Sequence, residues 1–166
     1  MFHQIKLANG SILNCAAKQC EMKIPIVLLI ALSGIASGGW LTNFEQAQKT
    51  ARENHQLILL NFSGSDWCLP CIKMKKEIYE SDSFKKYAEN NLVLVNADFP
   101  RKKNAVSKEQ VKLNETLADL YNKEGKFPLS ILMTEDGKIL KQWEGCPNAS
   151  PEEFVSQLTK IINGNQ

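Results

Sequence analysis

The chain has little net charge for its size. Twenty Lys and Arg residues stand against eighteen Asp and Glu residues, which leaves a formal charge of +2 over 166 residues. Charges of both signs are scattered along the chain, so a strongly basic surface that would attract nucleic acid is not expected. Hydrophobic residues make up 43% and charged residues 23% of the sequence. This composition excludes a disordered or fibrous protein and is typical of one globular domain.

Long hydrophobic runs are also lacking. The apolar run at residues 24–36 is 13 residues long and is interrupted by Pro25, Ser33 and Gly34, whereas a membrane-spanning helix needs about 20 apolar residues. A basic residue precedes the run and small residues follow it, as in the hydrophobic region of a signal peptide. We therefore predict an N-terminal extension plus signal peptide over residues 1–38 and a domain over residues 39–166, exported to the periplasm or beyond. An uncleaved membrane anchor is the alternative.

The start of the chain and its cysteines bear on this prediction. Met22 and Lys23 would supply the basic start of a signal peptide without residues 1–21, so we take Met22 as the predicted true start. Removal of the leader leaves three of the five cysteines, namely Cys68, Cys71 and Cys146. Outside the cytosol no glutathione pool keeps thiols reduced. An exported pair of neighbouring thiols therefore implies an electron donor in the membrane or envelope.

Hydrophobic periodicity and capping residues predict an alternating order of helices and strands. The expected helices cover about 44–54, 68–80, 82–90, 109–123 and 151–162, and the expected strands cover 57–62, 92–98, 129–133 and 139–143. Gly125 is expected at the C′ position of the fourth helix, and Asp136-Gly137 at the turn of a hairpin. The first two strands should be parallel because a helix connects them. The order predicts an α/β domain with a central mixed sheet of about four strands flanked by helices, a βαβ half followed by a ββα half.

Two motifs add a resemblance to this pattern. Residues 65–71 (SDWCLPC) directly follow the first predicted strand, and Lys126-Phe127-Pro128 opens the third. Together with the order of elements, they resemble exported bacterial thioredoxin-like proteins over residues 43–162. The resemblance implies the thioredoxin fold and thiol–disulfide exchange without a cofactor. It also implies that Pro128 is a cis-proline facing the cysteines, that the Phe127 backbone meets an extended substrate, and that Trp67 belongs to an apolar docking rim.

The pair Cys68 and Cys71 carries the chemistry of this prediction. Residues three apart in the first turn of a helix share a face, at a separation that a disulfide can bridge. Cys68 meets unpaired backbone N–H groups and the positive end of the helix dipole, which could lower a thiol pKa from about 8.5 to about 7. Cys68 is therefore the predicted nucleophile and Cys71 the resolving thiol. Asp66 would oppose the lowering if its side chain pointed inward.

The residues between the cysteines bear on the direction of exchange. Pro70 sits in the first helical turn, where its missing N–H group costs little, and should stiffen the motif. In the resembling family such a proline often accompanies reducing behaviour, although Leu69 replaces the usual small residue. We predict a reductase rather than an oxidase, acting on the thiols and disulfides of exported proteins.

Metal binding is the alternative use of the same thiols. Zinc needs four nitrogen or sulfur ligands. His55 precedes the central strand and the cysteines follow it, which separates them by more than about 20 Å, so no zinc site is predicted. Two thiolates could still hold Cu(I). The alternative function is therefore a thioredoxin-fold binding module or Cu(I) carrier that uses the thiols without turnover.

Two further positions concern the surroundings of the pair. Asn61 occupies the place where thioredoxins often bury a carboxylate behind the second cysteine. An amide cannot relay a proton, so water or another group must do so. Cys146 follows the last predicted strand, which should return to the edge where Pro128 lies. We expect it near the pair, either as a third redox thiol or as an idle, partly buried residue.

Overall fold

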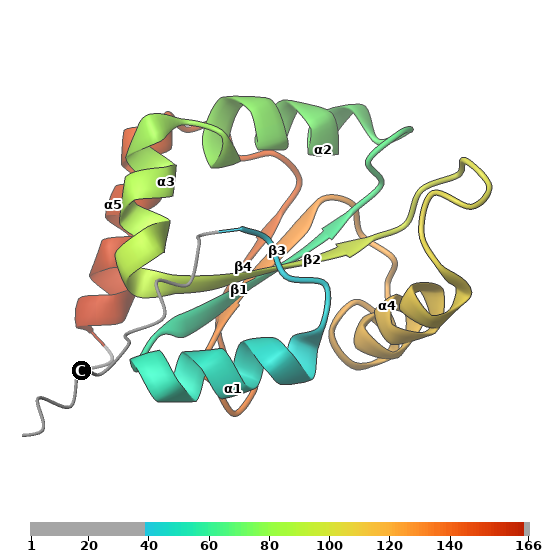
Figure 1. Cartoon of the computed structure of the whole chain (residues 1–166). Coiled ribbons are helices and arrows are strands. Elements are labelled where there is room, and N and C mark those ends of the chain that lie inside the picture. Colours follow the sequence, from blue (N-terminus) through green and yellow to red (C-terminus); the bar gives the residue numbers. More distant parts are fainter. Residues whose placement is uncertain (1–38, 165–166) are drawn as a thin grey trace, which may run out of the picture. The chain divides into compact units, whose positions relative to one another are not determined.

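The computed structural model describes residues 39–164. The predicted N-terminal extension, the signal peptide with its hydrophobic region at 24–36, and the start at Met22 lie outside the described residues. A four-stranded sheet in the order β2-β1-β3-β4 forms the centre of the domain (Figure 1). Its strands are β1 (Leu57–Ser63), β2 (Leu92–Asp98), β3 (Leu129–Met133) and β4 (Ile139–Glu144).

The strand directions confirm the predicted mixed sheet. The pair β1 and β2 is parallel, whereas β3 is antiparallel to both β1 and β4. The first half of the sheet is therefore a βαβ unit and the second half a hairpin followed by a helix. This arrangement is the thioredoxin fold that the sequence predicts.

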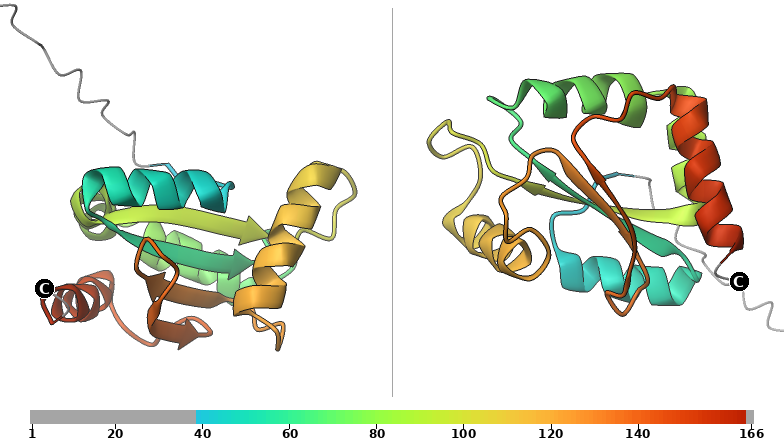
Figure 2. Two further views of the ribbon diagram at one scale, coloured as in Figure 1. Left: turned by 90° about the horizontal axis from the view of Figure 1, so that it is seen from below. Right: turned by 180° about the vertical axis from the view of Figure 1, so that it is seen from behind.

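Helices cover both faces of the sheet (Figures 1 and 2). One face packs against α1 (Phe44–Asn54) and α4 (Lys108–Tyr121). The other packs against α2 (Leu69–Met74), the π-helical turn η1 (Lys75–Tyr79), α3 (Asp82–Asn91) and α5 (Pro151–Asn163). All five α-helices in the described part of the chain begin at side-chain caps, the N-caps being Asn43, Cys68, Ser81, Ser107 and Ser150. Within residues 39–164, none of the helices combines the length and the hydropathy that a bilayer crossing requires.

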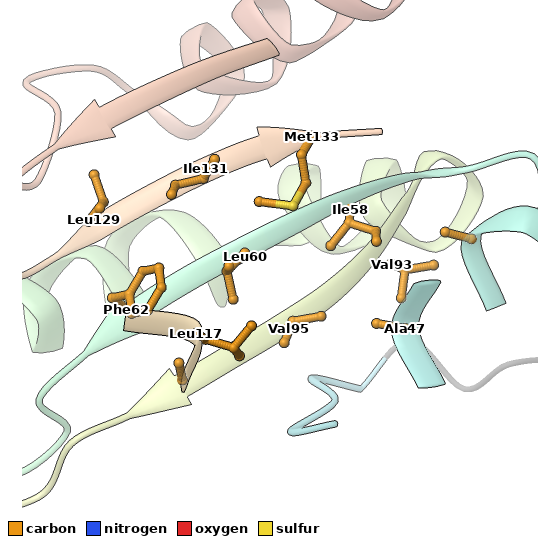
Figure 3. Packing of buried hydrophobic residues seen from close by; sticks show 12 residues of the cluster. Ala47, Ile58, Leu60, Phe62, Val93, Val95, Leu117, Leu129, Ile131 and Met133 are labelled. Carbon is orange, nitrogen blue, oxygen red and sulfur yellow. The ribbon is translucent and has the colours of Figure 1, made fainter. Parts of the chain in front are cut away.

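The central strand β1 supplies side chains to both layers, because successive residues of a strand point to opposite faces. Ile58, Leu60 and Phe62 are fully buried in the layer covered by α1 and α4 (Figure 3). On the opposite face, Leu59 is equally buried, but Asn61 and Ser63 follow it along the strand. The layer beneath α2 therefore changes from apolar to polar at the end of β1 that leads to the cysteines.

Two predicted helix boundaries are wrong. Helix α4 ends at Tyr121 and not at residue 123, and Gly125 does not occupy its C′ position. The side chain of Asn122 instead accepts the backbone N–H of Lys126 at 2.8 Å and donates to its carbonyl oxygen at 2.9 Å. This side chain closes a separate turn, in which Gly125 adopts φ of +63°. The single helix expected over 68–80 is divided into α2 and η1.

A short extended segment before α1 was not predicted. The N–H of Leu41 donates to the carbonyl of Leu94 at 2.8 Å, and the N–H of Asn96 donates to the carbonyl of Leu41 at 2.9 Å. These bonds attach the segment to the outer edge of β2. As a result, the ring of Trp40 packs on Tyr79 with 4.9 Å between ring centroids.

The aromatic cluster beneath α5 should dominate the stability of the second layer. Phe154 is 0% exposed and its ring lies 5.1 Å from that of Trp143. We expect Phe154→Ala to lower the free energy of unfolding by about 3–5 kcal/mol, because it leaves a cavity in a packed core. Leu120→Ala, at a side chain that is 63% exposed, should change it by less than about 0.5 kcal/mol. Urea unfolding followed by circular dichroism would measure both, and equal effects would contradict the assigned core.

Candidate active site

The structure joins Cys68 and Cys71 in a disulfide with 5.2 Å between their Cα atoms. Cys68 is the N-cap of α2, and its sulfur accepts the backbone N–H of Cys71 at 3.3 Å. Pro70 lies in the first turn, where a residue needs no N–H partner. The two cysteines are 4% and 6% exposed. The two cysteines are therefore about equally buried in the disulfide form. They differ in position, because Cys68 caps the helix and Cys71 lies within it.

Trp67 lies across the loop that leads to the cysteines. Its indole N–H donates to the carbonyl of Phe99 at 2.7 Å, and its ring meets that of Phe127 edge-on at 5.5 Å. The guanidinium of Arg101 lies 4.5 Å from the ring centroid, close enough for a cation–π interaction. A Cβ atom on Gly64 would clash with the indole ring of Trp67. Gly64 is thus required for this arrangement, and sequence reasoning did not identify it.

Asp66 points to the loop between β2 and α4. Its carboxylate accepts the backbone N–H groups of Arg101 at 2.9 Å and of Lys102 at 2.7 Å. These two hydrogen bonds hold the pKa of Asp66 below its ordinary value. The Asp66 carboxylate therefore connects the loop after β1 to the loop between β2 and α4.

The Phe127–Pro128 peptide bond is cis, as the resemblance implies. Phe127 is half-buried and packs against both Trp67 and Phe99. Pro128 is buried, and its carbonyl accepts the N–H of Gly145 at 2.8 Å. The structure therefore places Phe127 in contact with Trp67, the residue that precedes Cys68, although Phe127 and Trp67 lie far apart in the sequence.

A cavity of about 290 Å³, lined by polar and apolar side chains, lies beside Cys71. Its lining comes from the N-terminal segment, both parallel strands, the loop after β1, and the helices above them: Trp40, Asn61, Ser63, Ser65, Cys71, Ile72, Lys75, Tyr79 and Asn96. Asn61 and Cys71 therefore line the same cavity, and the side chain at position 61 is an amide and not a carboxylate. Burial raises the pKa of Tyr79 far above its ordinary value. Its neutral hydroxyl is 2.6 Å from that of Ser130.

Hydrogen bonds connect the wall of this cavity to a carboxylate behind it. Asn61 donates to Asn96 at 2.8 Å, and the hydroxyl of Ser63 lies 3.0 Å from Asn96 and 3.0 Å from Asp98. Asp98 also accepts the N–H of Ser65 at 2.9 Å and its hydroxyl at 2.6 Å. Sequence reasoning missed Ser63, Asn96 and Asp98. The available signal was polar residues at alternate positions near the ends of two otherwise apolar strands.

Cys146 is half-buried in the loop after β4 and packs against the layer beneath α5. It is a free thiol one residue beyond Gly145, which contacts Pro128. Partial burial raises the pKa of Cys146, while the charge of Lys73 opposes this effect. At neutral pH the group is therefore a thiol and a weak nucleophile. Among residues 39–164, no cluster of three or more His, Cys, Asp or Glu side chains is placed to hold a metal ion.

Comparison with known proteins agrees with this geometry. The model of the thioredoxin-like domain family matches residues 44–162. The disulfide bond reductase DsbH of Chlamydia pneumoniae is 38% identical over 120 residues, which cover 72% of this chain and 70% of the relative. The thioredoxin-related protein DsbJ of the same organism is 27% identical over 172 residues, covering 93% of this chain but 46% of DsbJ.

Solved structures agree as well. A DsbH oxidoreductase superposes with a TM-score of 0.69 at 33% identity, covering 75% of this chain and 84% of the other. A thioredoxin from Thermus thermophilus gives a TM-score of 0.53 at 13% identity, over 70% and 82% of the two chains, and shows the fold alone. The chain therefore belongs to the thioredoxin-like family, and it is a thiol–disulfide oxidoreductase.

Proposed function

We propose that this protein reduces disulfides in exported proteins, with Cys68 as the nucleophile and Cys71 as the resolving thiol. The observation that carries the proposal is the cap of α2, where the Cys71 N–H points at the sulfur of Cys68. A donor at this position favours thiolate over thiol, as does the adjoining end of the helix dipole. Cys71 lies inside the helix and has no such cap.

The proposed reaction has two exchange steps. The Cys68 thiolate attacks a substrate disulfide, forms a mixed disulfide and releases one substrate thiolate. The Cys71 thiolate then attacks the sulfur of Cys68, releases the second substrate thiolate and forms the disulfide seen in the structure. Two electrons pass to the substrate. A membrane or envelope donor must return them before the next cycle.

The substrate would bind against an apolar rim around the pair. Trp67 and Phe127, whose rings lie 5.5 Å apart, form one side of this rim, and the cis peptide bond joins Pro128 to Phe127. On α2, Leu69 is 77% and Ile72 42% exposed, which leaves an apolar surface beside the cysteines. An extended segment of a substrate protein could lie along the backbone of Phe127 and Pro128, with its disulfide over Cys68.

Reduction and export are supported by separate observations. The relative that shares 38% identity is named a disulfide bond reductase, and Pro70 lies between the cysteines as in reducing members of the resembling family. The run at residues 24–36 supports export to the periplasm. An exported pair oxidises unless it is reduced, so a reductase in that compartment depends on its donor.

Substitution of each cysteine separates the proposed roles. The wild type should accelerate insulin reduction by dithiothreitol. Cys68→Ser should abolish this acceleration because the nucleophile is lost, and Cys71→Ser should accumulate a mixed disulfide with insulin, visible by mass spectrometry. Cys146→Ser is the matched control and should retain the activity. Activity in Cys68→Ser would contradict the assignment, and an inactive wild type that binds Cu(I) tightly would favour the carrier.

The redox potential tests the proposed direction. We expect the pair to equilibrate nearer the potential of thioredoxin, about −270 mV, than that of the oxidant DsbA, about −120 mV. Incubation in glutathione buffers of graded composition, followed by acid quenching and thiol alkylation, would give the value. A potential near that of DsbA would show that the protein is an oxidase.

The pH dependence of alkylation tests the isolated thiol. Because burial raises the pKa of Cys146, its iodoacetamide reaction in the disulfide form should be slow at neutral pH. The rate should keep rising above the pH at which an ordinary exposed thiol, with a pKa of about 8.5, has reached its maximum. Mass spectrometry of the quenched protein would follow the reaction. Fast alkylation at neutral pH would instead support a redox role for Cys146.

A further inference from the structure

The resolving step needs a proton acceptor. Cys71 must lose its thiol proton before its sulfur can attack. Asn61, which lines the cavity beside Cys71, has an amide side chain and cannot accept that proton. We propose that Asp98, acting through Ser63 and water in this cavity, takes the proton of Cys71 during resolution. Asp98 and Ser63 are positioning residues in this scheme, which rests on the proposed function.

The position of Ser63 carries the inference. Its hydroxyl lies 3.0 Å from Oδ1 of Asn96 and 3.0 Å from Oδ1 of Asp98, but it has one proton and can donate to only one of them at a time. When Asp98 is ionised, the charged oxygen is the stronger acceptor. When Asp98 is protonated, it can donate to Ser63, which then donates to Asn96. The network stays hydrogen-bonded in both states, so a proton can move through it without leaving a buried group unpaired.

The cavity connects this pair to the sulfur. Ser63 and Cys71 are 7% and 6% exposed, and both line the same cavity of about 290 Å³. A cavity of this size holds several water molecules, since each occupies about 30 Å³ in the liquid, and the side chains of Ser63, Ser65 and Asn61 in its wall offer them hydrogen-bond partners. Water beside Cys71 can pass its proton to Ser63, and Ser63 passes its own proton to Asp98.

Both oxygens of Asp98 are hydrogen-bonded to residues that line the cavity. Oδ1 lies 3.0 Å from the hydroxyl of Ser63 and accepts the backbone N–H of Ser65 at 2.9 Å, and Oδ2 is 2.6 Å from the hydroxyl of Ser65, which is exposed. A proton held by Asp98 can therefore be released to solvent beside Ser65. This second connection returns Asp98 to its ionised state for the next cycle.

The step balances. The Cys71 sulfur loses its proton to Asp98 and attacks the Cys68 sulfur of the mixed disulfide. The new S–S bond forms as the Cys68–substrate bond breaks, and the electron pair leaves on the substrate thiolate. The substrate takes a proton from water, and Asp98 later releases its own.

The other titratable groups around the cavity do not suit this role. Lys75 is largely exposed and lies 3.8 Å from Glu80, with which it forms an ion pair. The pKa of Tyr79 is raised by burial, so its hydroxyl is neutral and bonded to Ser130. Asp66 is bonded to the loop after β2. Asp98 is therefore the carboxylate that the network joins to the cavity wall.

Dithiobis(nitrobenzoate) tests the inference, because each exchange step releases one coloured thiolate. In stopped-flow experiments with the reduced protein, the first phase reports the attack of Cys68 and the second the attack of Cys71. We expect Asp98→Asn to slow the second phase at least about tenfold at neutral pH and to shift the midpoint of its pH profile upward by about one unit. The first phase should change by less than about twofold.

Two variants and a control separate a proton route from a structural role. Ser63→Ala should reproduce the shift, although it leaves the bonds between Asp98 and Ser65 in place, and it serves as the test if Asp98→Asn fails to fold. Asp66→Asn removes the same charge from the neighbouring loop and should leave the second midpoint in place. An unmoved midpoint in both Asp98→Asn and Ser63→Ala, or a loss that is equal at every pH, would overturn the inference. Failure of the wild type to release the second thiolate would instead count against the proposed function.

Discussion

The parallel pairing of β1 with β2 is the constraint on which the rest of the site depends. Its register places Asn61 opposite Asn96 and Ser63 opposite Asp98. The polar C-terminal ends of the two strands therefore lie side by side. The chain leaving β1 supplies the cysteines, and the chain leaving β2 supplies Phe99, which holds Trp67. A shift by one residue would turn the polar side chains of one strand into the other layer. The register therefore determines both the core and the surroundings of the disulfide.

Much of the fold follows from local sequence. The apolar runs, the capping residues and the Asp136-Gly137 turn are interactions between near neighbours, and each was sufficient to place its element. The end of α4 was not predicted, because Asn122 closes its turn through side-chain bonds that have no periodic signature. The attachment of Leu41 to β2 was missed for a different reason, since one bridging residue is too short to give a strand pattern.

The cysteine pair could be predicted because its motif is contiguous, whereas its polar surroundings could not. The network from Asn61 to Asp98 joins two strands whose relative register the sequence alone does not specify. Cys68 and Cys71 are almost equally buried in the disulfide form, so exposure does not separate the two sulfurs. Their difference comes from backbone geometry, because only Cys68 caps the helix. A short length of backbone thus distinguishes two otherwise similar sulfurs.

The pairing of Leu41 with β2 also affects how the protein meets other molecules. β2 and β4 are the outer strands of the sheet, and an outer strand with free backbone groups can recruit a strand from another chain. Leu41 occupies the N–H of Asn96 and the carbonyl of Leu94, while β4 carries the exposed charges of Lys141 and Glu144. Both outer strands are therefore poor templates for a strand from another chain, which disfavours edge-to-edge aggregation.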